Sequence, residues 1–349
     1  MTTDALPNAA LALARTFTAG GRLIVSALDR PDHARHVAVE FVHPAITGAR
    51  SLPSFAVAPN DIDHVVRPED ALLIIESAGD TLEQTPDRTL PENAQLLVVG
   101  ADMTEPELVR WYHVLWELVQ LGLEHPGLTG GSASEGGDPT NFLYPFLDAA
   151  EDDEPALLAS MVSSQNAKQD ESTELAAQTV AANAAAIDVI ADEIGSAVAA
   201  GGTVFSIGNG GSACDAAQLA RLLQGHGLRA MSLAEDPATL TALANDLGVG
   251  RIFSRQVDAS VRPGDVVVLF STSGSSANLL SVLDLDVATE LVIVACAGYG
   301  GGPMAAHANV DHRLIIDSSS VHRIQEAQGV LIGEICSRVP VTAPTEVHA

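Results

Sequence analysis

The chain has 349 residues and a formal net charge of −28, from 17 basic and 45 acidic side chains, and 47% of its residues are hydrophobic. The hydrophobic fraction excludes disorder of the whole chain, and the length predicts two domains. The charge argues against nucleic acid and anionic membrane surfaces as partners, because both would repel the chain, yet a local group of backbone amides can still bind a small anion.

Cysteine usage and the N-terminal sequence bear on the cellular compartment. The three cysteines form no CxxC pair, no apolar run reaches the length of a membrane span, and the N-terminus carries Asp4 where a secretory signal needs basic residues. We therefore expect a cytoplasmic protein with unpaired thiols and no membrane association.

The first predicted domain covers residues 1–124. Its short apolar runs alternate with segments of helical character, which indicates a parallel sheet with helices on both faces. A long helix is expected from about Pro106 to Leu123. The predicted strands are Arg22–Leu28, Ser54–Ala58, Ala71–Ser77 and Gln95–Ala101.

Residues 125–155 are predicted to form a linker. The segment is rich in Gly, Ser, Pro and acidic residues, a composition that buries little surface and breaks helices. Its middle, Asn141–Leu147, is aromatic, so we expect this part to dock on a domain or on a partner subunit.

The second predicted domain covers residues 156–340, followed by a tail at 341–349. The Ala-rich segment Ala156–Ala200 contains no Pro and predicts one or two helices, and a last helix is expected from about Val321 to Val339. Five predicted strands lie between these segments: Thr203–Gly208, Leu228–Ala234, Asp265–Ser271, Glu290–Cys296 and His312–Asp317.

The two halves resemble each other in sequence. FTAGGRLIVSA (Phe17–Ala27) parallels VAAGGTVFSIG (Val198–Gly208), and RPEDALLIIESAGD (Arg67–Asp80) parallels RPGDVVVLFSTSGS (Arg262–Ser275). We interpret the chain as a diverged internal duplication with one strand fewer in the first copy. The alternative is two α/β domains that share only common strand sequences.

Two loops of the second half are predicted to bind an anion. In SIGNGGSACDAAQLA (Ser206–Ala220) a strand, a Gly-rich turn and a helix follow one another, and the amides and dipole at the helix start favour an anion. The loop lacks the lysine and the glycine spacing of nucleotide-binding loops, so we expect no nucleotide cofactor. The second loop, STSGSSAN (Ser271–Asn278), fits a phosphate monoester; the alternative is an ordinary Ser-rich helix cap.

With three further motifs, AND (Ala244–Asp246), IFSRQV (Ile252–Val257) and RIQE (Arg323–Glu326), these loops resemble the sugar isomerase (SIS) domain. More narrowly they resemble the phosphoheptose isomerases, which interconvert sedoheptulose 7-phosphate and its aldose partner. The resemblance covers about Leu157–Val339 and implies a flavodoxin-like fold, a tetrameric arrangement of domains and a bound sugar phosphate. It implies these substrate-binding residues: Asn209, Gly210, Gly211, Ser212, Asn245, Asp246, Ser271, Thr272, Ser273, Ser276 and Gln325.

The second half departs from the family at the positions that transfer protons. The family's His and the Glu four residues later are Gln218 and Leu222 here, and its proton-donating His is Gly333. Its Asp in the last helix is His322. A leucine cannot abstract a proton and a glycine cannot donate one. This half alone is therefore expected to bind a sugar phosphate without isomerising it.

The first half shows the opposite pattern. Aligned on the shared core, His36 and Glu40 fall on the family's His and Glu positions, and their i, i+4 spacing puts both on one helical face. His113 matches the proton donor, Asp102 matches the family's Asp, and Glu105 stands where a Gln is usual. The alternative is a surface pair on one helix and a core histidine on another.

These patterns predict that each half supplies what the other lacks. The second half would bind the phosphate, and the first would provide Glu40 as base, His113 as acid and Asp102 as a further catalytic residue for aldose–ketose interconversion. A divalent metal such as zinc is expected on His36, Glu40, Glu105 and His113. A homodimer would supply four SIS domains, the family's usual number. The competing interpretation is a non-catalytic phosphosugar-binding regulator or a protein-assembly factor.

Overall fold

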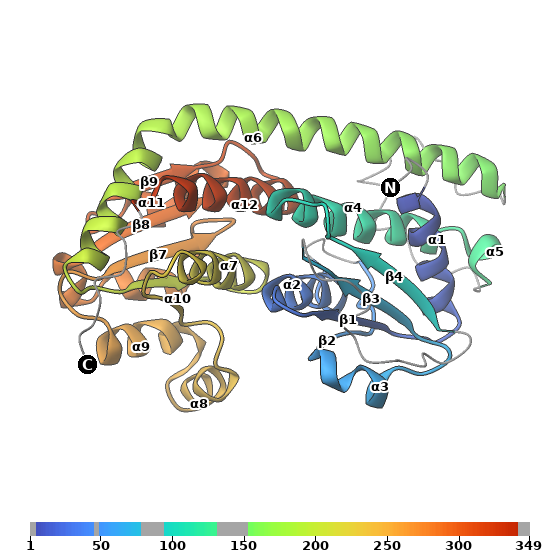
Figure 1. Ribbon diagram of the computed structural model, residues 1–349, viewed down its shortest axis with the longest axis horizontal. Coiled ribbons are helices and arrows are strands. Elements are labelled where there is room, and N and C mark those ends of the chain that lie inside the picture. The colour runs from blue at the N-terminus through green and yellow to red at the C-terminus, as the bar shows by residue number, and fades with distance from the viewer. Residues whose placement is uncertain (1–4, 45–48, 78–93, 131–152, 341–349) are drawn as a thin grey trace. The chain divides into compact units, whose positions relative to one another are not determined.

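The structure is a computed structural model, and it describes residues 5–44, 49–77, 94–130 and 153–340 (Figure 1). The chain divides into two units, residues 1–171 and 172–349. Each unit is built on an all-parallel sheet, one of four strands and one of five. The expected α/β class with two such sheets is therefore confirmed.

The first unit contains the sheet of order β2-β1-β3-β4. Its strands are β1 (Leu23–Ala27), β2 (Ser54–Val57), β3 (Ala71–Ile75) and β4 (Gln95–Val99). Its helices are α1 (Ala5–Thr18), α2 (Pro31–Val42), the 3-10 turn η1 (Pro59–Asp61), α3 (Ile62–Val65), α4 (Glu105–Leu123) and α5 (Pro126–Thr129).

The core of the first unit lies on both faces of this sheet. Alternate residues of a strand point to opposite faces, so Val25 and Leu73 face one side of the sheet while Ile24 and Leu72 face the other. The larger cluster, on the side of Val25, also contains apolar residues of α1, α2 and α4. This packing holds α2 and α4 beside each other.

The second unit contains the sheet of order β6-β5-β7-β8-β9, the strand order of flavodoxin-like folds. Its strands are β5 (Val204–Ile207), β6 (Ala230–Ser232), β7 (Val266–Ser271), β8 (Val292–Ala297) and β9 (His312–Ile315). Its α-helices are α7 (Gly211–Gly225), α8 (Pro237–Leu247), α9 (Ile252–Ser260), α10 (Ala277–Leu283), α11 (Gly302–Ala306) and α12 (Val321–Arg338). Its 3-10 turns are η3 (Val249–Arg251), η4 (Asp286–Glu290) and η5 (Tyr299–Gly301).

Helix α6 (Glu154–Ala199) is one continuous helix where one or two were expected (Figure 1). The division between the two units falls within this helix, between residues 171 and 172. Of the predicted linker, residues 131–152 lie outside the described residues, as does the tail at 341–349, and α5 occupies part of the remainder.

All nine predicted strands are present. The order of the first four strands is the same in both units, and the second unit has one strand more. Within the described part of the chain, no helix combines the length and the hydropathy needed to cross a membrane.

Candidate functional site

The first Gly-rich loop joins β5 to α7. Gly210 has φ +55° and precedes the first residue of α7, and a Cβ on Gly208 would lie 2.1 Å from the carbonyl oxygen of Ser212. The turn therefore needs glycine at both positions. It brings the buried Ser212 and the amides of the first turn of α7 to the carboxyl end of the sheet, where open α/β folds bind ligands.

The second loop joins β7 to α10 and is shaped by its own serines. The amide of Gly274, at φ +63°, donates to Oγ of Ser271 at 3.0 Å, and the hydroxyls of Ser273 and Ser275 lie 2.9 Å apart. Oγ of Ser276 lies 3.4 Å from Oγ of Ser271. Ser273 and Ser275 are exposed, so their hydroxyls are accessible to a ligand.

Two asparagines join these loops. Nδ2 of Asn209 donates to Oδ1 of Asn278 at 2.9 Å, and Nδ2 of Asn278 donates to Oδ1 of Asn209 at 2.8 Å. Because β5 and β7 are neighbouring parallel strands, both loops leave the same edge of the sheet. The structure thus brings the two sets of predicted phosphate ligands together.

The other predicted substrate residues lie on helices. Asn245 and Asp246 are exposed on α8, where Nδ2 of Asn245 donates to Oδ1 of Asp246 at 2.8 Å. Gln325 is buried on α12, and its Oε1 accepts no hydrogen bond from the described residues. A buried acceptor without a donor is costly, so this oxygen is suited to a sugar hydroxyl.

Cys296, at the end of β8, is not a candidate nucleophile. Burial, and next the negative charge of Asp215, raise the pKa of its thiol well above the ordinary value, against a smaller opposing effect of the hydrogen bond with Gln328. The thiol therefore stays protonated at neutral pH, and only the thiolate is strongly nucleophilic.

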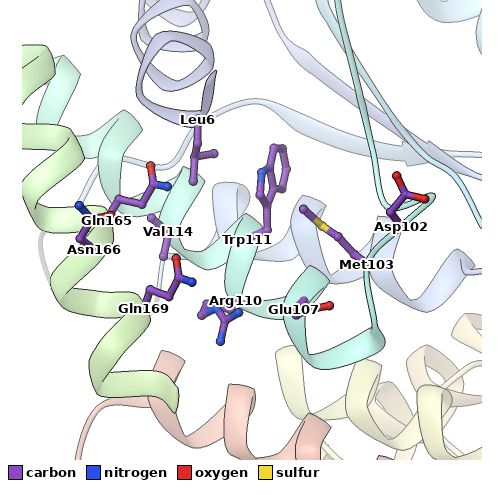
Figure 2. Close-up of a pocket in the computed structure, with 10 residues that line it drawn as sticks. All are labelled: Leu6, Asp102, Met103, Glu107, Arg110, Trp111, Val114, Gln165, Asn166 and Gln169. Carbon is purple, nitrogen blue, oxygen red and sulfur yellow. The ribbon is translucent and has the colours of Figure 1, made fainter. Parts of the chain in front are cut away.

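In the first unit, the loop before α4 carries the predicted catalytic Asp102. Helix α4 starts with a capping box, in which the amide of Thr104 donates to Glu107 at 2.9 Å and lowers the pKa of that carboxyl. Asp102 is exposed and borders a cavity of about 510 Å³ beside α1, α4 and α6 (Figure 2). The cavity is lined by Leu6, Asp102, Met103, Glu107, Arg110, Trp111, Val114, Gln165, Asn166 and Gln169.

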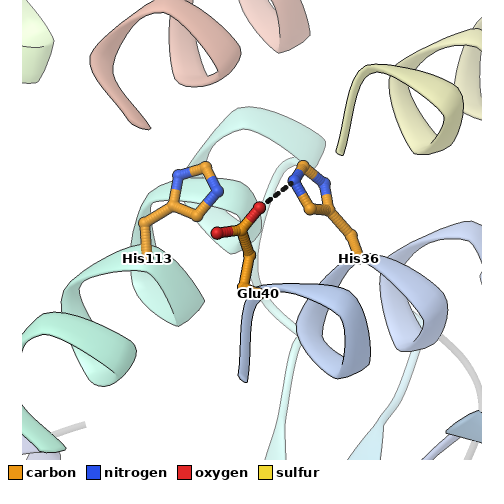
Figure 3. A group of neighbouring side chains, drawn as sticks. All are labelled: His36, Glu40 and His113. Atoms are coloured by element: carbon orange, nitrogen blue, oxygen red, sulfur yellow. Dashed lines mark ion pairs between the residues drawn. The ribbon is translucent and has the colours of Figure 1, made fainter. Parts of the chain in front are cut away.

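The structure brings together three residues of the predicted acid, base and metal set. His36 and Glu40 on α2 and His113 on α4 point toward one another (Figure 3). Nε2 of His36 lies 3.6 Å from Oε1 of Glu40, and one potential ligand atom from each of the three residues lies within 4.8 Å of the others. All three side chains are buried, at 2%, 4% and 0% exposed.

Glu105 does not belong to this group. Its carboxylate is hydrogen-bonded to Nε2 of His33, and its other oxygen lies 3.6 Å from Nε of Arg30. Asp32 lies 3.9 Å from the same His33 nitrogen. Glu105 is the first residue of α4. Its contacts with Arg30 and His33 therefore connect the first turn of α4 to the start of α2.

The family pattern does not predict Tyr112 or His33, yet both lie beside the three-residue group. The hydroxyl of Tyr112 and Nδ1 of His36 form a hydrogen bond of 2.7 Å. The Tyr112 ring also meets the His113 ring edge-on, with centroids 5.0 Å apart. In the sequence, only their places next to predicted site residues could have indicated these two. His33 precedes His36 by about one helical turn, and Tyr112 directly precedes His113.

His36, Glu40 and His113 fit a divalent metal such as zinc. Two imidazoles and a carboxylate are a ligand set that zinc takes in proteins. Nε2 of His36 is buried and makes no hydrogen bond to the described residues, so this nitrogen is not committed to another partner and could bind a cation. In a tetrahedral zinc site the ligand atoms lie about 3.3 Å apart, which is close to the 3.6 Å between Nε2 of His36 and Oε1 of Glu40. Among the described residues, one other group of three potential metal ligands lies equally close together: Asp32, His33 and Glu105. Both groups lie in the first unit.

Known proteins resemble the chain in sequence and in fold. The SIS domain model matches residues 169–298. A phosphoheptose isomerase from Paramagnetospirillum magneticum is 44% identical over 153 residues, which cover 42% of this chain and 78% of the relative. The chain belongs to the SIS-domain family. A phosphoheptose isomerase from Roseiflexus is 36% identical over 171 residues, covering 47% of this SIS protein and 86% of the relative.

A solved structure extends the likeness in fold to both units of the SIS protein. The C-terminal domain of glucosamine-fructose-6-phosphate aminotransferase from Francisella tularensis matches with a TM-score of 0.57, over 97% of this chain and 92% of that one. The two chains are 12% identical, so the match concerns the fold alone. It accords with the two parallel sheets seen here.

Proposed function

We propose that this SIS protein is an aldose–ketose isomerase that acts on a phosphorylated sugar of the sedoheptulose 7-phosphate type. One observation carries the proposal: His36, Glu40 and His113 come together in the first unit, at the positions where the second unit has Gln218, Leu222 and Gly333. The second unit, in turn, has the linked Ser- and Gly-rich loops. The two units therefore have complementary chemical groups.

The loops of the second unit are suited to the phosphate of the substrate. Hydroxyls and backbone amides, such as those of Ser273 and of the first turn of α7, can donate to phosphate oxygens without a charged side chain. The described loop residues carry no carboxylate except Asp215, one turn into α7. This local chemistry reconciles an anionic substrate with a chain of net charge −28.

We propose Glu40 and His113 as the groups that transfer protons. The Glu40 carboxylate would remove the proton from the carbon next to the carbonyl, and the electron pair left behind would form the carbon–carbon double bond of an enediol as the carbonyl oxygen takes up a proton. His113 would then return a proton to the former carbonyl carbon, while the hydroxyl of the neighbouring carbon gives up its proton and becomes the new carbonyl, which completes the aldose–ketose exchange. The reaction moves a hydrogen within the sugar and needs no external oxidant or reductant.

The same group would hold the metal through His36, Glu40 and His113. A bound divalent ion would polarise the carbonyl and hydroxyl oxygens of the sugar. Glu105 lies in the neighbouring group with Arg30 and His33, so we leave it out of the proposed ligand set.

One observation favours the second candidate function, a non-catalytic phosphosugar-binding regulator. The three side chains of the proposed acid–base group are at most 4% exposed, so a substrate reaches them only if covering elements move. A purely structural cluster would be buried in the same way, whereas the phosphate loops of the second unit would still bind a sugar phosphate.

The direct test is to incubate the purified full-length protein with sedoheptulose 7-phosphate and to follow the aldose product. Glu40→Gln and His113→Gln should each abolish turnover while Glu69→Gln and His43→Gln, which change exposed side chains, leave it intact. Ser273→Ala should reduce the thermal shift caused by the sugar phosphate in either candidate function. Turnover that survives both Glu40→Gln and His113→Gln would refute the catalytic assignment.

We also propose that the protein is a homodimer of two-unit chains, which supplies four SIS domains. Light scattering on the purified protein tests this directly. Mixing Ser273→Ala chains with Glu40→Gln chains adds a functional test. Recovery of isomerase activity in the mixture would indicate that chains in the oligomer complement one another.

A further inference from the structure

We infer that Tyr112 is a positioning residue for the group of His36, Glu40 and His113. In this role its hydroxyl oxygen accepts a hydrogen bond from Nδ1–H of His36, which leaves the lone pair of Nε2 directed at Glu40. The inference rests on the metal-binding part of the proposed function. It adds the residue that sets the tautomer and the ring orientation of the proposed metal ligand His36.

The contact that carries the inference is short and buried. The Tyr112 oxygen and Nδ1 of His36 are 2.7 Å apart, and the two residues are 1% and 2% exposed. With water excluded, the phenol is the partner that decides which ring nitrogen carries the proton. A histidine that binds a metal through one nitrogen usually donates its other N–H to a neighbouring oxygen, which fixes the tautomer and the ring orientation.

The other ring nitrogen of His36 supports this direction of the hydrogen bond. If Nε2 carried the proton, a hydrogen bond to the Glu40 carboxylate would be expected in this buried place. Instead Nε2 lies 3.6 Å from Oε1 of Glu40 and makes no hydrogen bond within the described residues. An unprotonated Nε2 beside the Glu40 carboxylate puts two potential ligand atoms on one side for a cation, and this is the arrangement that a metal site needs.

The aromatic ring of Tyr112 adds a steric constraint on both histidines. Its centroid lies 5.0 Å from that of His36 and 5.0 Å from that of His113, and the His113 contact is edge-on at 86°. The His36 and His113 rings are themselves 5.2 Å apart. The phenol ring therefore packs against both imidazoles and restricts their rotation.

The test uses the full-length protein and the Tyr112→Phe variant, which removes the hydroxyl and keeps the ring. Co²⁺ is titrated into the metal-free protein, and its visible absorption bands report binding. We expect Tyr112→Phe to weaken Co²⁺ affinity by about 10- to 100-fold, the usual effect of losing the partner of a metal-binding histidine. Tyr299→Phe, which changes a tyrosine that is 49% exposed, is the matched control and should leave the affinity unchanged.

A second readout tests the inference on the wild-type protein as well as on the variant. Nitrogen-15 spectra of the metal-free wild-type protein distinguish the two neutral histidine tautomers. We expect His36 to carry its proton on Nδ1 in the wild type and to lose this preference in Tyr112→Phe. A wild-type His36 with its proton on Nε2 overturns the inference, and so does an unchanged Co²⁺ affinity in folded Tyr112→Phe or a wild-type protein that binds no Co²⁺.

The isomerase assay separates this inference from the proposed reaction. If the wild type interconverts the sugar phosphates but Tyr112→Phe binds Co²⁺ as tightly as the wild type, the positioning role is wrong and the proposed function stands. If the wild type has no isomerase activity but Tyr112→Phe binds Co²⁺ more weakly, the positioning role stands and the proposed reaction is wrong.

Discussion

Asp70 and Asp265 hold equivalent positions in the two sheets of this protein. Each carboxylate accepts hydrogen bonds from the amide three residues earlier and from the amide just before the first strand of its unit. These amides belong to Arg67 and Arg22 for Asp70, at 3.0 and 2.9 Å, and to Arg262 and Thr203 for Asp265, at 2.7 and 2.8 Å. The same connection in both units supports the internal duplication predicted from the repeated AGG and RPxD sequences.

The first prediction concerns the acid dependence of stability at Asp70. Burial is the largest single influence and would raise the pKa of this carboxyl. The hydrogen bonds from the Arg22 side chain and from the amides of Arg67 and Arg22 together outweigh it and hold the pKa below its usual value. Since the folded pKa is lowered, the stabilisation is complete above the unfolded pKa of about 3.9 and is lost as pH falls through the folded pKa.

Asp70→Asn should therefore lower the free energy of unfolding at pH 7, by about 1–3 kcal/mol. The difference from the wild type should shrink as pH falls below about 4. Urea unfolding at several pH values measures both quantities, and the exposed Asp63→Asn serves as control. A difference that stays constant down to acid pH would contradict the assigned role of the carboxylate.

The second prediction concerns the link between the two phosphate loops. Asn209→Ala removes both hydrogen bonds to Asn278, whose buried amide then lacks its partner. We expect a loss of about 1–3 kcal/mol in the free energy of unfolding, together with a smaller thermal shift from sedoheptulose 7-phosphate. In a double-mutant cycle with Asn278→Ala the two losses should be strongly non-additive. Additive losses would show that the loops are not coupled through this pair.

The third prediction concerns the backbone of the second loop. Gly274 has φ +63°, and a Cβ there would lie 2.0 Å from the carbonyl oxygen of Gly301. Gly274→Ala should cost more than about 1 kcal/mol and should abolish the thermal shift from the sugar phosphate. Gly333→Ala on α12 is the control, since its added methyl meets nothing within 4 Å and should be neutral or slightly stabilising. Equal effects of the two substitutions would contradict the assigned strain.

The sequence predicted the strands well because continuous apolar runs such as Val266–Ser271 are a local signal of buried parallel strands. It placed Glu40 and His113 on two helices, and the structure brings these residues together because α2 and α4 pack side by side. It could not separate Glu105 from them. That outcome depends on how the first turns of the two helices face each other, which brings Arg30 and His33 to Glu105. The exposed position of Asp102 likewise depends on the loop before α4.

The last prediction tests whether the second unit lost a site that the first unit has. Gln218 lies on α7 and Gly333 on α12, two helices that pack against each other, and Leu222 follows Gln218 by four residues. The triple substitution Gln218→His, Leu222→Glu and Gly333→His would rebuild the family pattern there. In a His36→Gln background, which removes a ligand of the first unit's site, we expect this variant to regain Co²⁺ binding. The same variant with Gly333→Gln in place of Gly333→His lacks the second imidazole and should bind Co²⁺ more weakly. Equal Co²⁺ affinity in the two variants would show that α12 does not complete a metal site with α7.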